Sequence, residues 1–180
     1  MKIYIILTYT GTMLSKIIKL RTKDEFSHVS IALDPNLKQM YSFGRLNPYN
    51  PFIGGFVHEY IDKGTFKRFK KTKAKIIEIE ISEKKYARLK RIIKKIELNK
   101  SKYKFNVLVL FAVGLNIKLR FKNSFYCAEF VKYVIDNANI NIELPELIKP
   151  ESFKEIQGKE VYRGLLREYT SIYNIPNGHT

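Results

Sequence analysis

SFYCAEFV, residues 124–131, is the stretch that most constrains the fold, because it begins an expected amphipathic helix at the only cysteine of the chain. Apolar residues recur at helical spacing through Cys127–Asn139, so one face of that helix is expected to pack on a core. A helix N-terminus also stabilises a thiolate, because its unpaired N–H groups and its dipole favour negative charge. Cys127 is therefore either a small core residue or a nucleophile.

A second informative stretch, FSHVSIAL at residues 26–33, alternates apolar and polar side chains as a β-strand does and carries His28 near its start. DPN at residues 34–36 is a turn sequence, because Asp and Asn accept local backbone hydrogen bonds and Pro fixes φ. Gln39–Phe43 is then expected to return as the second strand of a hairpin. His28 is either a strand-end histidine bonded to the backbone or the base that a cysteine nucleophile requires.

The remaining segments predict an α+β fold. Met1–Leu7 and Lys75–Ile81 read as strands, and Ser82 is an expected N-cap for a helix with an apolar stripe and a basic face. Further expectations are short helices over Thr12–Leu20 and Phe105–Val113, a loop over Arg45–Gly55, short strands over Phe56–Tyr60 and Thr65–Phe69, a helical turn at Glu151–Ile156 and a last strand at Glu160–Arg167. Together these elements predict an antiparallel sheet with helices packed against it.

The composition predicts a single domain over residues 1–180, with about 170–180 as a flexible tail. Hydrophobic residues make up 45% of the chain, which is typical of a globular protein and not of a disordered one. No apolar run reaches the roughly 18 residues of a membrane-spanning helix. A single cysteine excludes an intrachain disulfide and fits a reducing cytosol, so we expect a cytoplasmic protein. One cysteine and three scattered histidines predict no metal or other cofactor.

Short strings occur along nearly the whole chain: TYTGT (8–12), FSHVSIALD (26–34), MYSFGR (40–45), GGFVHE (54–59), FYCAEFV (125–131) and IKPE (148–151). Together they resemble the circularly permuted NlpC/P60 group of papain-like proteins, which includes YiiX-like and lecithin:retinol-acyltransferase-like branches. The most specific element is the Ser-His-Val strand far upstream of the Cys-x-Glu-Phe-Val helix. The order of histidine before cysteine is itself the mark of the permutation.

The resemblance implies a papain-like half-barrel, in which the helix of Cys127 packs against an antiparallel sheet that presents His28. It implies that His28 takes the thiol proton and that Cys127 attacks an amide or ester carbonyl to form an acyl-enzyme. Backbone N–H groups at the start of the helix would hold the oxyanion. Members of this group cleave peptides and amides in one branch and transfer lipid acyl groups in another.

The resemblance also implies a polar residue on the next strand that orients the imidazole. Counting across the hairpin places that residue at Ser42 or Tyr41, and a register shift of one residue exchanges the two. Neither is a carboxylate or a histidine, so the expected activity is low, narrow or absent. His58 is the rival base, and its neighbour Glu59 is expected on the opposite face of an extended segment.

Two residues are expected to contact the substrate. Arg45, which the resemblance places near the mouth of the cleft, either meets a carboxylate or phosphate or is solvated. Tyr126, beside the thiol, is the second expected contact.

The formal net charge of +16 indicates that an anionic membrane surface or a polyanion is a candidate partner, although the basic runs at 67–75 and 84–95 can equally be solvated faces. Specific nucleic-acid binding is not expected. The sequence thus predicts a thiol hydrolase that cleaves a peptide or other amide bond. The alternatives are a lipid acyltransferase or lipid-amide hydrolase, and a non-catalytic protein of the same fold that binds a polyanion or nucleic acid.

Overall fold

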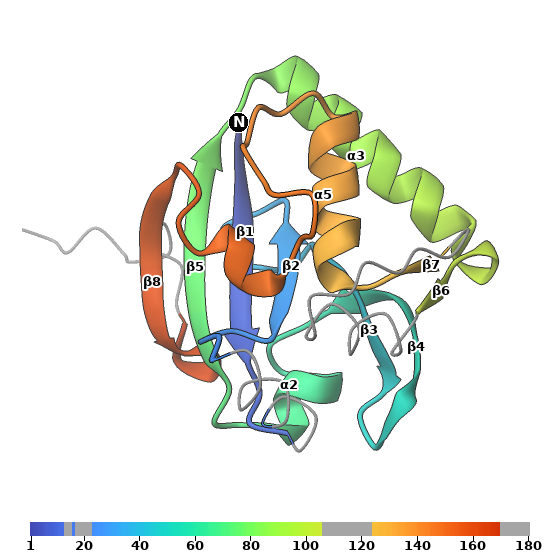
Figure 1. Ribbon diagram of the computed structural model, residues 1–180, viewed down its shortest axis with the longest axis vertical. Coiled ribbons are helices and arrows are strands. Elements are labelled where there is room, and N and C mark those ends of the chain that lie inside the picture. The colour runs from blue at the N-terminus through green and yellow to red at the C-terminus, as the bar shows by residue number, and fades with distance from the viewer. Residues whose placement is uncertain (13–15, 17–22, 106–123, 170–180) are drawn as a thin grey trace, which may run out of the picture.

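A six-stranded antiparallel sheet with helices on both faces forms the α+β fold of this protein (Figure 1). The computed structural model describes residues 1–12, 16, 23–105 and 124–169. The strands of the sheet are β1 (Lys2–Tyr9), β2 (His28–Ala32), β3 (Met40–Asn47), β4 (Asn50–Glu59), β5 (Lys73–Glu80) and β8 (Lys159–Leu165), in the spatial order β4-β3-β2-β1-β5-β8. A short parallel pair, β6 (Lys104–Phe105) and β7 (Ser124–Phe125), lies beside β4.

Strand β1 lies in the middle of the sheet and is buried on both faces. Its alternate side chains belong to two different apolar clusters: Ile3, Ile5 and Leu7 to one, Tyr4 and Ile6 to the other. A strand that is buried on both sides needs apolar residues at every position, which explains the unbroken run of bulky side chains. Strand β5 pairs with β1 over its whole length, from Lys2 opposite Glu80 to Tyr9 opposite Lys73.

Helix α5 (Cys127–Asn137) packs on β2 and β3, and α3 (Glu83–Leu98) packs beside it, as Figure 1 shows. Both helices contribute their apolar stripes to the first cluster. Ser82 caps α3 by accepting a hydrogen bond from the backbone N–H of Lys85 at 3.3 Å. On the other face, Phe66 of α2 (Gly64–Arg68) and Leu166 of η3 (Leu166–Glu168) complete the second cluster. The remaining short elements are η1 (Lys100–Lys102) and η2 (Pro150–Phe153).

Most of the expected elements are confirmed: the N-terminal strand, the hairpin after His28, the strand before Ser82, the two amphipathic helices and the last strand. The helix expected at Thr12–Leu20, most of the one expected at Phe105–Val113 and the tail at 170–180 lie outside the described residues. The structure describes Phe105 itself, which lies in β6.

Two predictions were wrong. Arg45–Gly55 is not a loop, because β3 continues to Asn47 and β4 begins at Asn50. Gly54 lies within β4, where an added Cβ would come 2.3 Å from Cδ1 of Phe105, so this glycine permits a close approach instead of marking a loop. Thr65–Phe69 is not a strand either, since Gly64–Arg68 forms α2 and only Phe66 of that helix is buried.

Candidate active site

Cys127 is the first residue of α5, the helix that packs on β2 and β3. The residue is 2% exposed and shares its helix face with Phe130, Val131 and Val134. The aromatic ring of Tyr126, immediately before it, is buried, and its hydroxyl donates to the backbone oxygen of Ile148 at 2.7 Å. The thiol is therefore held at a helix N-terminus whose entry is anchored to the core.

His28 is the first residue of β2, and its ring contacts a carboxylate. Its Nε2 lies 2.9 Å from Oε1 of Glu59, the last residue of β4, and 3.3 Å from the hydroxyl of Ser30. Ser30 in turn donates to the other oxygen of Glu59. The side chains of His28 and Glu59 are only 18% and 10% exposed, so the pair is largely shielded from water.

The charge state of His28 is set by this carboxylate and by the thiol. Burial lowers the pKa of His28, but electrostatic and hydrogen-bonding interactions with the side chains of Glu59 and Cys127 raise it to about 10. The imidazole is consequently protonated at neutral pH. The structure thus places Cys127 and His28, 99 residues apart in the sequence, close enough for their side chains to interact.

Gly44 of β3 leaves space for the side chains of His28 and Glu59. An added Cβ there would lie 3.4 Å from Cε1 of His28 and 3.7 Å from Oε1 of Glu59. The described pairing between β2 and β3 is limited to Ile31–Tyr41 and Ala32–Met40, so it ends before His28. A carboxylate from the edge strand can therefore reach an imidazole on β2 past the intervening strand.

Ser42 and Tyr41 do not orient the imidazole, which corrects the sequence prediction. The hydroxyl of Ser42 is buried and donates to the backbone oxygen of Val29 at 2.8 Å. The ring of Tyr41 stacks on those of His58 and Phe56, with centroid distances of 4.7 and 5.8 Å. The carboxylate that contacts the imidazole of His28 belongs to Glu59.

Glu59 is a site residue that the sequence did not predict, because it reaches His28 from β4, past β3. The register of the actual hairpin pairs Met40 with Glu59 and Ser42 with Val57, which puts Glu59 on the same sheet face as Ser42. The expectation that His58 and Glu59 face opposite ways is confirmed. The strand expected at Phe56–Tyr60 includes Glu59, but no local signal in it points to His28.

His58 is not the base of this site, because both of its ring nitrogens are occupied elsewhere. Its Nε2 lies 2.7 Å from the backbone oxygen of Lys38, and its Nδ1 lies 2.9 Å from the hydroxyl of Tyr60. A neutral imidazole with its proton on Nε2 satisfies both contacts, since the carbonyl accepts and the Tyr60 hydroxyl donates.

The two expected substrate contacts have different surroundings. Arg45, on β3, is half-buried and donates from Nη2 to the hydroxyl of Thr12 at 3.1 Å. Burial and the charge of Arg68 lower the pKa of Arg45. Tyr126 is 2% exposed and bonds to Ile148, which assigns it to the core instead of to substrate binding.

The segment Ile148–Glu151 holds both halves of the site. The backbone oxygen of Ile148 binds Tyr126, the neighbour of Cys127, and Oε2 of Glu151 accepts from the backbone N–H of Phe26 at 2.9 Å, two residues before His28. Element η2, which contains Glu151, packs against β1 and β2. One loop therefore fixes the start of α5 and the start of β2 relative to each other.

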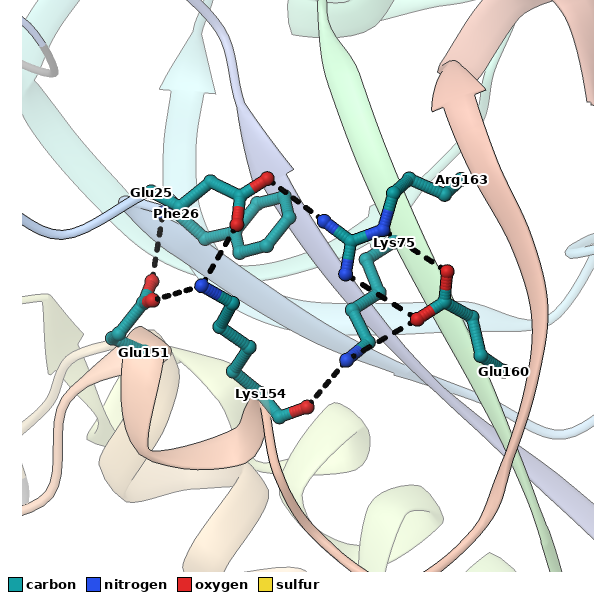
Figure 2. A network of polar contacts seen from close by, with 7 residues as sticks. All are labelled: Glu25, Phe26, Lys75, Glu151, Lys154, Glu160 and Arg163. Carbon is teal, nitrogen blue, oxygen red and sulfur yellow. Dashed lines mark hydrogen bonds and ion pairs between the residues drawn. The ribbon is translucent and has the colours of Figure 1, made fainter.

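A network of ion pairs connects η2 with β8 and with the residues that precede β2 (Figure 2). Lys154 bridges Glu25 and Glu151 at 2.9 and 3.1 Å, and Arg163 of β8 contacts Glu25 at 2.9 Å. The hydrogen bond from Lys154 does most to lower the pKa of Glu25. These side chains are partly exposed, so each pair contributes little to stability, but together they tie the approach to β2 to η2 and β8.

No helix in the described ranges has the length and apolar character needed to cross a bilayer, and no three His, Cys, Asp or Glu side chains among those residues converge as metal ligands do. In comparisons with known proteins, no protein-family model matches this chain, and no curated protein or solved structure is significantly similar to it.

Proposed function

We propose that this protein is a papain-like thiol hydrolase that cleaves an amide bond, with Cys127 as nucleophile and His28 as base. The observation that carries the proposal is the contact of one imidazole with both the only thiol of the chain and a shielded carboxylate. A nucleophile, a base and a group that orients the base are the three parts that activate a thiol.

Glu59 has the orienting role in this proposal. Its carboxylate occupies Nε2 of His28, which leaves Nδ1 as the nitrogen that faces the thiol. The carboxylate also stabilises the imidazolium that forms when the thiol loses its proton. With a glutamate in this position, the weak activity expected from a serine or tyrosine no longer follows.

The reaction then proceeds in two halves. In the resting enzyme His28 already carries the proton of the Cys127 thiol, and the thiolate sulfur attacks the carbonyl carbon of the substrate. Backbone N–H groups in the first turn of α5 stabilise the oxyanion. The C–N bond breaks as His28 returns its proton to the leaving amine, which yields a thioester on Cys127. His28 next takes a proton from water, the hydroxide attacks the thioester, and breaking of the C–S bond releases the carboxylic acid and restores the thiolate–imidazolium pair.

The fold and the chain order support the permuted NlpC/P60 form of this proposal. A helix that begins with the cysteine packs on an antiparallel sheet whose second strand carries the histidine, and histidine precedes cysteine in the chain. The alternative of lipid acyl transfer rested partly on residues 107–113, which lie outside the described residues. The described site therefore favours an amide substrate.

The proposal can be tested by trapping the acyl-enzyme. p-Nitrophenyl acetate should transfer one acetyl group to Cys127, detected by intact-mass and peptide mass spectrometry. His28→Gln should slow this acylation by at least about tenfold, because general-base assistance typically contributes about a hundredfold or more. Cys127→Ala should remove the modification and retain the fold. Acetylation at the same rate in wild type and His28→Gln would overturn the assignment of the base.

A further inference from the structure

A small pocket lies next to Glu59, between the end of the β3–β4 hairpin and α2 with its preceding turn. It has a volume of about 190 Å³, and its lining includes Arg45, Glu59, Tyr60, Lys63 and Thr65. Pockets for whole drug-sized ligands measure about 300–1,000 Å³. A pocket of this size suits one functional group of a ligand instead of an entire molecule.

The cations of the pocket have no acidic partner among the described residues. The guanidinium of Arg45 donates to the hydroxyl of Thr12, and the ammonium of Lys63 lies over the ring of Tyr60, 4.8 Å from its centroid. Arg68 is close enough to Arg45 for the two positive charges to repel each other. A half-buried arginine beside further cations is costly unless an anion joins it.

Glu59 does not supply that anion. Both of its carboxylate oxygens are engaged, one with His28 and the other with Ser30. The other ionisable groups of opposite sign in the lining, Arg45 and Lys63, are both cations.

We propose that this pocket binds a single acidic group of a ligand, a carboxylate or a phosphate, through Arg45 and Lys63. A guanidinium matches either group because its planar fork can donate two parallel hydrogen bonds. The pocket shares Glu59 with the candidate active site, so a ligand anchored here lies one side chain away from His28. The inference goes beyond the proposed hydrolase activity and does not require it.

The test is a titration of the full-length Cys127→Ala protein, so that thiol chemistry plays no part in the result. Inorganic phosphate in one arm and acetate in the other are added at constant ionic strength, and the Arg45 side-chain Nε–Hε resonance is followed by NMR. Saturable shifts with either anion are expected, and the arm with the higher affinity identifies the acidic group.

Matched variants make the result specific. Arg45→Gln should weaken binding by at least about tenfold, because hydrogen bonds between charged groups are the strong ones; its binding is read from backbone amides of Lys63 and Thr65. Arg88→Gln, which removes the same charge from an exposed position on α3, should change the affinity less than about twofold. If Arg45→Gln does not fold, Lys63→Gln replaces it and should weaken binding likewise. Absence of saturable shifts, or equal weakening by the pocket variant and Arg88→Gln, would overturn the proposal.

Discussion

Replacing Glu59 by glutamine removes one negative charge from the imidazole of His28 and preserves the size of the side chain. In the wild-type protein the pKa of His28 is about 10 against an ordinary value of 6.5. Each pKa unit corresponds to about 1.4 kcal/mol, so this difference favours the imidazolium by about 5 kcal/mol. Coulomb's law at the 2.9 Å contact with an effective dielectric constant of about 20 gives an attraction of about 6 kcal/mol before the opposing effect of burial.

The charge of Glu59 is therefore a main cause of the raised pKa, beside the interaction with Cys127, and Glu59→Gln should lower the pKa of His28 by at least about two units. A histidine with a raised pKa adds stability that is fully present below pH 6.5 and is lost as the pH rises through about 10. The variant should thus be less stable than wild type at pH 6, and the difference in unfolding free energy should shrink toward pH 10.

Two assays measure these quantities. The Cε1–H resonance of His28 is followed by NMR from pH 5 to about 10.5, the range in which its titration is expected, and urea unfolding is measured at several pH values. Glu80→Gln is the control, because it removes a carboxylate from an exposed position at the end of β5; it should leave the titration of His28 unchanged. A wild-type His28 that titrates near 6.5, or a Glu59→Gln variant that titrates as wild type does, would refute the reasoning.

Three further substitutions separate site residues from core residues. Ser42→Ala should lower the unfolding free energy by about 1–3 kcal/mol, because a buried hydrogen bond to the backbone is lost. Acylation of Cys127 by p-nitrophenyl acetate should be unchanged. Slowed acylation would show that Ser42 takes part in the active site. Tyr126→Phe should lower stability by a similar amount of about 1–3 kcal/mol, and slow acylation by displacing the start of α5; no change in either measurement would contradict the anchoring role. Gly44→Ala should be tolerated, because its Cβ would make an ordinary contact with His28. Gly44→Val should slow the acylation of Cys127. Equal acylation rates for both variants would show that the space beside the His28 ring is unimportant.

The pattern of apolar residues predicted most of the fold because local periodicity decided most elements. Three patterns each predicted a single type of element: the isoleucine-rich N-terminal run and the alternation around His28 predicted strands, and the apolar stripe of α5 predicted a helix. The stretch at 45–55 was misread because Pro, Asn and Gly usually mark loops. Here Gly54 lies in a strand, where the close approach of the Phe105 side chain requires its small size.

The candidate site was predicted in part. Cys127 and His28 could be paired because each stands at the start of an element of known type and the chain order resembles a known permutation. Glu59 could not be paired with His28 by counting across one hairpin, because it reaches the ring from an edge strand, past β3. That contact depends on how the sheet brings β4 toward β2, which no local pattern encodes.

The measurement that most directly tests the account is the pH dependence of Cys127 alkylation by iodoacetamide, in wild type and in His28→Gln. Only the thiolate reacts, so an isolated thiol gains about tenfold in rate per pH unit below its pKa. The account predicts nearly equal rates at about pH 6 and 8 in wild type, because His28 holds the thiolate, and a rise of about a hundredfold over that interval in His28→Gln. A steep rise of the same size in both proteins would contradict it.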